Sequence, residues 1–239
     1  MSDEKHPIPV ERTLGNGLPV GRGVFLGTVA VGISSLLWGK AAWSHVTGVV
    51  SPVAESVVPV LPSSGWRIYS VADHLPTFDP TTWRLEVNGL VETPQSLDYT
   101  TLRALPRVEQ VSTFHCVTGW TVKNVHWAGV RIADVLAPAA PRSSAQAIRF
   151  VSAEHPYDDY LTLRQAALPE VLLAYEMDGK PLSRGHGAPL RLVIPEMYGY
   201  KNVKWLKAIE LVARTDDGYW EALGYDRDAW VGHSNGYGA

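Results

Sequence analysis

Short runs of β-branched and aromatic residues alternate with turn-forming residues throughout the stretch from Trp83 to Ala213. Runs of this length are typical of short strands, because extended backbone accommodates branched and aromatic side chains well. Short helices are predicted at residues 101–105, 132–136 and 162–167, each followed within two residues by a proline. The pattern therefore predicts an α+β domain that is mixed and mainly β. The predicted strands cover residues 83–87, 90–91, 108–114, 122–130, 147–152, 171–177, 190–194 and 208–213.

Two dipeptides in this stretch have the composition of tight hairpin turns. Asn88-Gly89 follows the first predicted strand, and Asp178-Gly179 follows the strand at 171–177. A type I′ turn requires positive φ at both central residues, which Asn, Asp and Gly tolerate. Each dipeptide therefore predicts a two-stranded β-hairpin.

The N-terminal part differs in composition from the rest of the chain. Residues 23–39 carry no charge, and as a helix they would span about 25 Å, slightly less than the ~30 Å hydrocarbon core of a bilayer. Apolar residues would surround this helix on all sides, which favours a membrane segment over a buried core helix. We expect residues 1–40 to be a leader or membrane anchor, 41–65 a Pro/Val/Ser-rich tether, and 66–239 the folded domain.

The residues around the start of the uncharged run bear on the export route. Residues 21–27, Gly-Arg-Gly-Val-Phe-Leu-Gly, resemble a twin-arginine export signal in which Gly23 replaces the second arginine. We therefore expect a membrane-associated or exported protein that acts on the extracytoplasmic face.

The cysteine count and the net charge exclude several classes of protein. Cys116 is the single cysteine among 239 residues. One cysteine excludes an intramolecular disulfide, iron–sulfur clusters held by several thiolates, cysteine-rich zinc sites and the Cys-x-x-Cys-His haem attachment. The formal net charge of −3 provides no global basic field, so nucleic acid is not expected as a partner.

Cys116 falls where a predicted strand opens into a loop. Residues 108–114 have the composition of a strand, whereas Thr118 and Gly119 interrupt that pattern. A thiol at the end of a strand can reach a ligand, but free cysteine is also among the most frequently buried residues. The segment by itself leaves both roles open.

Positive charge is concentrated in residues 180–207 of an otherwise slightly acidic chain. Glycines in this segment would let backbone N–H groups approach a ligand, and Arg191 lies within a predicted interior strand. A buried arginine requires an anionic partner, and no acidic residue is close to it in sequence. The segment therefore predicts a phosphate-binding site, with a solvated charged face as the alternative. Its charged or titratable side chains are Lys180, Arg184, His186, Arg191, Lys201, Lys204 and Lys207, with Glu196 as the one acid.

Three blocks of the sequence carry a family resemblance. The first is residues 69–76, Tyr-Ser-Val-Ala-Asp-His-Leu-Pro, and the second joins the Cys116 segment to residues 125–130, Val-His-Trp-Ala-Gly-Val. The third, residues 171–206, includes Arg-Gly-His-Gly-Ala-Pro-Leu-Arg and Lys-Asn-Val-Lys-Trp. In this order, and together covering roughly residues 66–213, the blocks resemble the sulfite oxidase family of molybdopterin enzymes. The resemblance implies a sulfite-oxidase-type molybdopterin-binding fold, preceded here by the N-terminal hydrophobic segment.

The resemblance implies a molybdenum–molybdopterin cofactor and a role for each matched residue. Cys116 would be the catalytic thiolate ligand of molybdenum, a soft donor suited to a sulfur-rich metal site. Tyr157 falls near the active-site tyrosine of the family. Tyr160 is a rival for that role, because residues 157–160, Tyr-Asp-Asp-Tyr, depart from the family pattern. The implied cofactor-binding residues are Tyr69, Asp73, His74, Ser152, His186, Arg191, Asn202, Val203 and Lys204.

Two departures from the family bear on the substrate. Sulfite oxidases carry arginines in the segments that match Ala72 and Trp120, where they help to bind an oxyanion. A less cationic, more aromatic pocket favours a neutral substrate over sulfite. In this respect the chain looks closer to the bacterial periplasmic methionine-sulfoxide reductase catalytic subunit and its single-domain relatives. The resemblance implies neither an immunoglobulin-like dimerisation domain nor a fused haem domain.

Together these features predict a molybdenum-dependent oxidoreductase that carries out two-electron oxygen-atom transfer on a small molecule. The expected reaction is the reduction of an S-oxide or N-oxide. Because the sequence contains no haem or cluster motif, the electrons are expected to come from a separate membrane cytochrome or quinol-linked partner. Two alternatives stay open: a sulfite dehydrogenase, and a metal-free module that binds an anionic ligand through residues 184–204.

Overall fold

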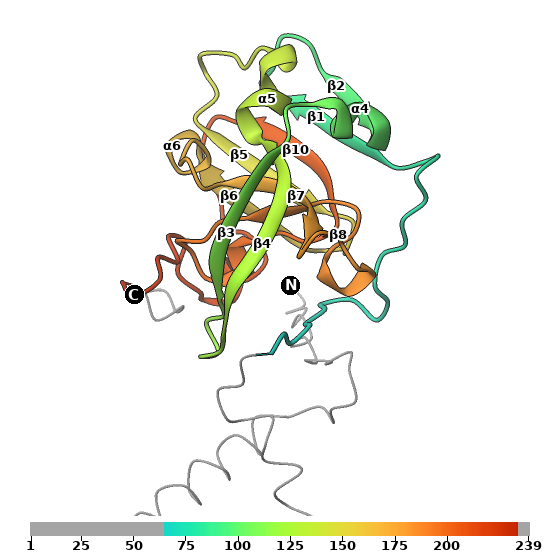
Figure 1. Ribbon diagram of the computed structural model, residues 1–239. Coiled ribbons are helices and arrows are strands. Elements are labelled where there is room, and N and C mark those ends of the chain that lie inside the picture. Colours follow the sequence, from blue (N-terminus) through green and yellow to red (C-terminus); the bar gives the residue numbers. More distant parts are fainter. Residues whose placement is uncertain (1–64, 234–239) are drawn as a thin grey trace, which may run out of the picture. The chain divides into compact units, whose positions relative to one another are not determined.

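The computed structural model describes residues 65–233, and the chain divides into two compact units, residues 1–70 and residues 71–239. The described part of the first unit, residues 65–70, contains no helix or strand. The expected leader or anchor at 1–40 and nearly all of the tether lie outside the described residues. Between residues 65 and 233, no helix has the length and apolar character needed to cross a lipid bilayer. All the elements below belong to the second unit (Figure 1).

The first sheet contains strands from near the start and from near the end of this unit's sequence. Its five strands follow in the order β2 (Gln95–Asp98), β1 (Arg84–Gly89), β10 (Leu206–Val212), β5 (Ala147–Ser152) and β6 (Asp158–Thr162). β1 and β10 pair in parallel, and the other pairs in this sheet are antiparallel. Parallel neighbours require a long connection, and here the whole second sheet lies between them in sequence.

The second sheet contains the hairpin that carries the cysteine. Its strands follow in the order β3 (Val108–His115), β4 (Thr121–Arg131), β7 (Leu172–Met177) and β8 (Lys180–Pro181), and β9 (Arg191–Val193) also pairs with β7. All these pairs are antiparallel. Figure 1 shows β3 and β4 as a long two-stranded ribbon that runs to the loop between them.

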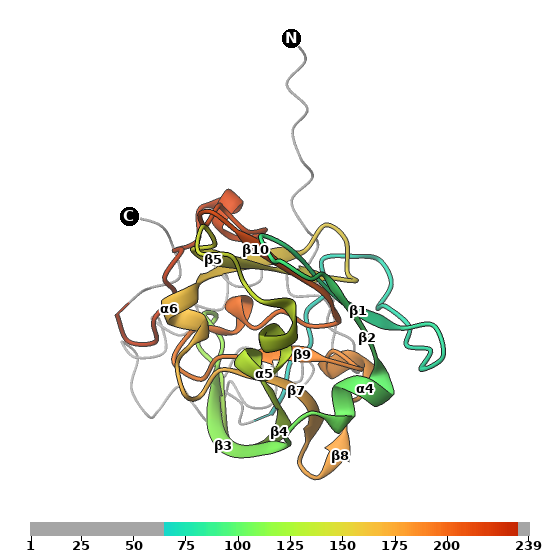
Figure 2. The ribbon, with the colours of Figure 1, turned by 90° about the horizontal axis from the view of Figure 1, so that it is seen from above.

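A hydrophobic cluster contains residues from both sheets. Leu85 and Ile209 of the first sheet and Leu173 and Leu192 of the second are 0% exposed. Burial of each such side chain stabilises the fold by about 1.5–3 kcal/mol. Figure 2 shows β5 and β10 on one side and β3 and β4 on the other, with α5 (Ile132–Leu136) near the centre. Because the two sheets share this core, they form one scaffold for the loops between the strands.

Short helices begin at polar caps. α4 (Tyr99–Ala104) follows Asp98, whose carboxylate accepts a hydrogen bond from the Thr101 N–H at 2.7 Å. α6 (Leu163–Ala166) follows Thr162, which forms a capping box with Gln165. These helices and α5 confirm the three predicted helices, and the mixed, mainly β α+β fold is also confirmed. The described 3₁₀ helices are η2 (Ala137–Ala139), η3 (Arg184–His186), η4 (Gly199–Lys201) and η5 (Glu221–Leu223).

The hairpin predicted at Asn88-Gly89 is wrong. β1 continues through both residues, and Gly89 pairs with Leu211 of β10. The antiparallel partner of β1 is β2, which begins only at Gln95, so residues 90–91 belong to a connection. Pairing with β10 therefore outweighs the local turn preference.

The hairpin predicted at Asp178-Gly179 is confirmed by β7 and β8. Both turn residues have positive φ, 51° and 73°, as a type I′ turn requires. β2 and β6 were not predicted. β6 begins with Asp158 and Asp159, a residue type that is depleted in strands, so its pattern was weak.

Candidate active site

The loop between β3 and β4 holds Cys116 at the end of a strand. β3 ends at His115, and the Cys116 N–H donates to the Trp120 carbonyl at 2.9 Å. The Gly119 N–H donates to the Cys116 carbonyl at 3.0 Å, which closes the loop into a tight turn. The thiol is partly exposed, with Sγ 3.2 Å from the Thr118 hydroxyl. The thiol therefore lies where a strand opens into a loop, outside the hydrophobic cluster.

Aromatic rings connect this loop to a buried arginine. The ring of Phe114, two residues before Cys116, lies 5.5 Å from the Trp120 ring. The guanidinium carbon of Arg191 lies 5.7 Å from the centre of the Phe114 ring and 5.2 Å from that of Trp127. The thiol loop and Arg191 are far apart in sequence but share one aromatic cluster.

Trp120 itself is buried, with 2% of its surface exposed. Its ring packs against Phe114. The more aromatic substrate pocket expected from the sequence stays a prediction. Ala72, the other departure from the family, is partly exposed within a bend at residues 71–74. Of the two positions, Ala72 is therefore the more open to solvent.

Arg191 is the first residue of β9 and is 3% exposed. Its guanidinium donates to the carbonyls of His186, at 3.2 Å, and Leu192, at 3.5 Å. Burial lowers the pKa of Arg191 to about 10, and no carboxylate among the described residues counteracts this shift. A buried cation with carbonyl and aromatic neighbours favours an anionic ligand.

His186 and Lys204 add two basic groups to the surroundings of Arg191. Burial lowers the pKa of the His186 imidazole to about 4, and the charges of Arg191 and Lys204 contribute. Burial also lowers the pKa of Lys204 to about 7, although the charge of Glu154 acts in the opposite direction. Gly187, directly after η3, has φ of 102° and lets the backbone there lie close to Lys204, because a Cβ at residue 187 would be 2.9 Å from the Lys204 Cβ. These three basic residues, Arg191, His186 and Lys204, are called the cation site below, because they provide the positive charge. An anion bound there would favour their charged forms.

Hydrogen bonds connect η3 to residues 75 and 76, at the end of the first block of the family resemblance. Arg184 donates to the carbonyls of Pro76, at 3.1 Å, and Leu75. The Val71 N–H donates to the Glu154 carboxylate at 2.8 Å. Arg184 and Glu154 were not among the predicted site residues. Arg184 stood in the basic segment, whereas nothing in the local pattern singled out Glu154.

The predicted cofactor-binding residues of the first block are Tyr69, Asp73 and His74. Asp73 and His74 are exposed on the bend at residues 71–74. Tyr69 belongs to the first unit. A role of these three side chains in cofactor binding stays a prediction.

Three further predicted contacts face the protein interior. The Ser152 hydroxyl donates to the Lys204 carbonyl at 2.7 Å and accepts a backbone N–H at 2.9 Å. The Asn202 side chain accepts a backbone N–H at 2.7 Å, and Val203 is 0% exposed. These contacts hold the segment that carries Lys204, so they support the cation site from within.

Tyr157 and Tyr160 have different surroundings. Burial raises the pKa of Tyr157 well above its usual value. The Tyr157 hydroxyl donates to the Tyr200 carbonyl. Tyr160 lies on β6 and pairs with Arg149 of β5. The assignment of Tyr157, with Tyr160 as its rival, stays a prediction.

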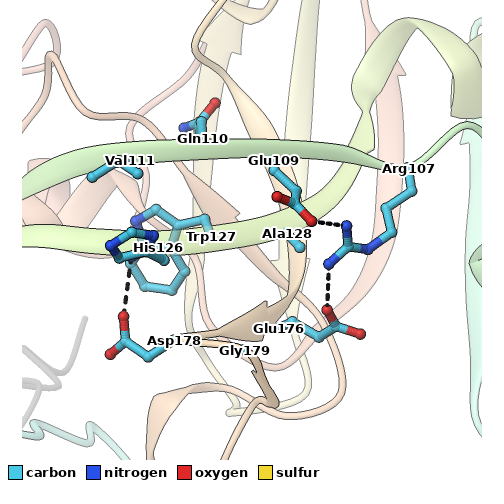
Figure 3. Close-up of a pocket in the computed structure, with 10 residues that line it drawn as sticks. All are labelled: Arg107, Glu109, Gln110, Val111, His126, Trp127, Ala128, Glu176, Asp178 and Gly179. Carbon is cyan, nitrogen blue, oxygen red and sulfur yellow. Dashed lines mark hydrogen bonds and ion pairs between the residues drawn. The ribbon is translucent and has the colours of Figure 1, made fainter.

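A separate hollow of about 590 Å³ lies against the second sheet (Figure 3). Residues of β3, β4 and the turn after β7 line it, and Arg107 forms ion pairs there with Glu109 and, at 2.9 Å, with Glu176. None of the site residues predicted from the sequence lines this hollow. Trp127 lines it and also contacts Arg191, so the hollow lies next to the cation site.

The thiol at a strand end offers a soft metal ligand, and the buried cations offer a site for an anionic group. The family described as "Oxidoreductase molybdopterin binding domain" matches residues 72–220, more than half of the chain. The chain belongs to this family and is a sulfite-oxidase-family molybdopterin oxidoreductase. The resemblance expected from the sequence is confirmed, and the protein is an enzyme with a molybdenum–molybdopterin cofactor.

Several proteins are similar to this chain over much of its length. The uncharacterized oxidoreductase YuiH of Bacillus subtilis is 34% identical over 199 residues, 82% of this chain and 96% of that protein. The sulfite oxidase of Arabidopsis thaliana is 33% identical over 65% of this chain and 47% of that protein. The protein-methionine-sulfoxide reductase catalytic subunit MsrP of Gluconobacter oxydans is 32% identical over 66% of this chain and 56% of that protein. The chain thus spans about half the length of the last two relatives.

A solved structure supports the fold. The sulfane dehydrogenase SoxCD of Paracoccus pantotrophus aligns with a TM-score of 0.55 at 23% identity, over 59% of this chain and 41% of that chain. At this identity the similarity concerns the fold alone.

The described residues fit the cofactor. Arg191 is buried and has no carboxylate partner between residues 65 and 233, and the lowered pKa values of His186 and Lys204 likewise suit the cofactor's phosphate. Cys116 offers a soft donor at the end of a strand. The metal-free module left open by the sequence is set aside, because the family is one of enzymes.

Proposed function

We propose that this protein reduces a small S-oxide or N-oxide by two-electron oxygen-atom transfer. The observation that carries the proposal is the shared aromatic cluster of the Cys116 loop and Arg191. Two-electron exchange and acceptance of the oxygen atom are the chemistry that the bound cofactor supplies. For a sulfoxide, the balance is one substrate, two electrons and two protons, giving one sulfide and one water.

Cys116 would hold the metal through its thiolate. The side chain is partly exposed, and the turn at residues 116–120 fixes its backbone through two hydrogen bonds. A thiolate is a soft ligand and suits a metal that is otherwise bound by the sulfurs of the cofactor.

Arg191, Lys204 and His186 would bind the phosphate and the adjoining part of the pterin. Charge-assisted hydrogen bonds to phosphate are stronger than neutral ones, and a water-poor site strengthens them further. Ser152, Asn202 and Val203 would keep the Lys204 segment in place. Tyr69, Asp73 and His74 would contribute the first pterin-touching segment.

Tyr157 would donate a hydrogen bond to the oxygen of the substrate. Burial raises its pKa well above the usual value, so the hydroxyl keeps its proton at neutral pH. A neutral donor can stabilise charge that develops on the substrate oxygen during the reaction. In the structure this hydroxyl donates its one proton to the Tyr200 carbonyl, so donation to the substrate oxygen would replace that hydrogen bond.

Two side chains favour a neutral substrate over sulfite. Ala72 and Trp120 place no cation where sulfite oxidases have arginines, so the charge of sulfite would be poorly compensated. A sulfoxide or N-oxide is neutral overall and presents one oxygen. The similarity to MsrP, named as a protein-methionine-sulfoxide reductase catalytic subunit, supports the same substrate class.

The electrons would come from a separate membrane cytochrome or quinol-linked protein. The uncharged run at residues 23–39 supports an extracytoplasmic, membrane-associated location, with 1–40 as leader or anchor and 41–65 as tether to the domain at 66–239. Such a location would bring the domain close to a membrane-bound electron donor.

A dye-linked assay tests the proposal. Molybdenum-loaded protein should oxidise a reduced dye when dimethyl sulfoxide, methionine sulfoxide or trimethylamine N-oxide is added, and Cys116→Ser should not. Sulfite-dependent dye reduction without any oxide reduction would contradict the proposal. It would support the second candidate, a sulfite dehydrogenase, which the similarity to the Arabidopsis sulfite oxidase favours.

A further inference from the structure

A buried ion cluster lies apart from the residues of the cation site. The ammonium of Lys201, in η4, donates to the carboxylate of Asp159, in β6, and at 2.8 Å to that of Glu221, in η5. The side chains of the lysine and Asp159 are each 2% exposed, and that of Glu221 is 1% exposed. Three segments that are distant in sequence meet at this charged centre, and the proposed function does not use it.

The cluster contains two acids and one base. Asp159 Oδ2 and Glu221 Oε2 are buried without a hydrogen-bond partner in the described structure. With both acids ionised, the buried site would carry an uncompensated negative charge, which is costly. Burial raises the pKa of Asp159 to about 8 against the opposing charge of Lys201. A proton on Asp159 makes the cluster neutral near pH 7.

Gly218 leaves room for the second of these acids. A Cβ at Gly218 would lie 2.7 Å from Glu221 Oε2 and 2.8 Å from the Asp158 carbonyl oxygen. A larger residue would therefore displace the carboxylate from Lys201. The glycine at residue 218 therefore leaves the space that the Glu221 carboxylate occupies beside Lys201.

Tyr157 is linked to this cluster through two contacts. Its hydroxyl donates to the carbonyl of Tyr200, the residue before Lys201. Its ring stacks on that of Tyr219, two residues before Glu221, with centroids 5.7 Å apart. After burial, the charges of the two acids are the largest causes that raise the pKa of Tyr157. The position and the protonation of this hydroxyl therefore depend on the cluster.

We propose that Asp159, Lys201 and Glu221 are positioning residues for Tyr157 and carry one exchangeable proton whose loss lowers turnover. This inference rests on the role of Tyr157 in the proposed function. Loss of the proton would place a net negative charge behind the Tyr157 hydroxyl. The hydroxyl would then hold its own proton more tightly and donate less well to a substrate oxygen.

Other charged or titratable groups surround the cluster. Tyr157 and Tyr200 both have raised pKa values through burial, so they stay neutral while Asp159 loses its proton. Asp217 and Arg227 are exposed and paired at 2.5 Å, so solvent screens their effect. The groups that act on the cluster or on its two tyrosines are Tyr157, Tyr200, Tyr225, Glu154, Asp217, Asp226 and Arg227.

Infrared difference spectroscopy on the full-length, molybdenum-loaded protein detects the proton independently of turnover. A carboxylic acid C=O band should be present near pH 7 and lost by about pH 9. Asp159→Asn and Glu221→Gln should remove or shift the band, whereas the exposed-acid control Glu170→Gln should leave it. Lys201→Met should keep the band to higher pH, because the charge of Lys201 opposes the raised pKa of Asp159. The absence of such a band in the wild-type protein would show that the cluster carries no exchangeable proton near pH 7.

The pH dependence of kcat tests the link to Tyr157. With a pKa of about 8 for Asp159, the proton of the cluster is about tenfold scarcer at pH 9 than at pH 7, so kcat should fall by up to about tenfold over this range while KM changes little. Glu221→Gln leaves a neutral pair of Asp159 and Lys201, and this fall should disappear. The same fall in Glu221→Gln and Asp159→Asn as in the wild type would refute the positioning role.

The two readouts separate this inference from the proposed function. No S- or N-oxide reduction, together with an intact infrared band, would show that the proposed function is wrong and that the link to Tyr157 falls with it. Oxide reduction with an unchanged pH dependence in both amide variants would show that only the inference is wrong. Because the amide variants preserve side-chain size, these outcomes do not depend on whether Lys201→Met folds.

Discussion

The guanidinium carbon of Arg191 lies 5.7 Å from the centre of the Phe114 ring. Phe114 precedes Cys116 by two residues, so this contact relates β9 to the loop that carries the thiol. The proposed function assigns Arg191 and Cys116 to different parts of one cofactor. A displacement of either segment should therefore weaken cofactor binding as a whole.

Cys116→Ser should abolish turnover and leave the domain folded. The serine oxygen is a much poorer donor than a thiolate for a sulfur-rich site, and the side chain lies outside the hydrophobic cluster. Molybdenum content, circular dichroism and dye-linked kcat measure the effect. Thr118→Val, which alters the neighbouring hydroxyl, is the control that should stay active. Near-wild-type activity of Cys116→Ser would rule out the thiolate assignment.

Arg191→Met should lower cofactor occupancy more than it lowers the activity per bound molybdenum. A charge-assisted hydrogen bond contributes about 1.5–3 kcal/mol, so affinity should fall by roughly 10- to 150-fold. Pterin and molybdenum analysis of the purified variant provides the measurement. Arg149→Met removes an arginine that pairs with Glu210 at 3.0 Å on the first sheet, and it should load normally. Full loading of Arg191→Met would contradict the phosphate assignment.

The pH dependence of stability should differ between the cofactor-free and the loaded protein. In the free protein, burial lowers the pKa of Lys204 from 10.5 to about 7, so the native state binds fewer protons than the unfolded state between these values. Stability of the free protein should therefore rise between about pH 7 and pH 10. A bound phosphate restores the charged form, so the loaded protein should show a smaller rise.

Thermal unfolding of both forms across this range measures the difference. Lys204→Met should remove the rise that Lys204 contributes to the free protein. Equal pH dependence in the free and loaded wild-type proteins would argue against an anion at Lys204.

Ala72→Arg should shift the substrate preference toward sulfite. Ala72 is partly exposed, so an arginine there can be accommodated and would supply a cation for an oxyanion. Trp120→Arg is a poorer test, because a buried charge would destabilise the fold. The ratio of kcat/KM for sulfite to that for a sulfoxide should rise by roughly 10-fold, about 1.4 kcal/mol. An unchanged ratio would mean that Ala72 does not face the substrate.

Removal of residues 1–40 should release the protein from membranes without loss of dye-linked activity. The matched blocks lie after this segment, and the family match begins at residue 72. Membrane fractionation and the dye assay on both versions of the protein give the answer. A truncated protein that stays bound to membranes would place the anchor in residues 41–65.

Local signals in the sequence determined most elements of the fold. The capping box at Thr162 and the Asp178-Gly179 turn act through neighbouring residues, so their patterns specify the backbone without distant contacts. Asn88-Gly89 carries an equally strong local pattern, but its backbone pairs with β10, far along the chain. A turn preference is worth little against a ladder of backbone hydrogen bonds inside a sheet.

For the site, the sequence alone determined the chemical inventory: one soft thiol, a basic segment and a family resemblance that the comparisons confirm. Burial and orientation were decided only by the tertiary structure. In the folded protein Trp120 is buried, and the Asn202 side chain accepts a hydrogen bond from a backbone N–H. It also joined Lys201 to two acids from separate segments. Burial changes the charge state and the available partners of a side chain, and it depends on segments that no local pattern relates to one another.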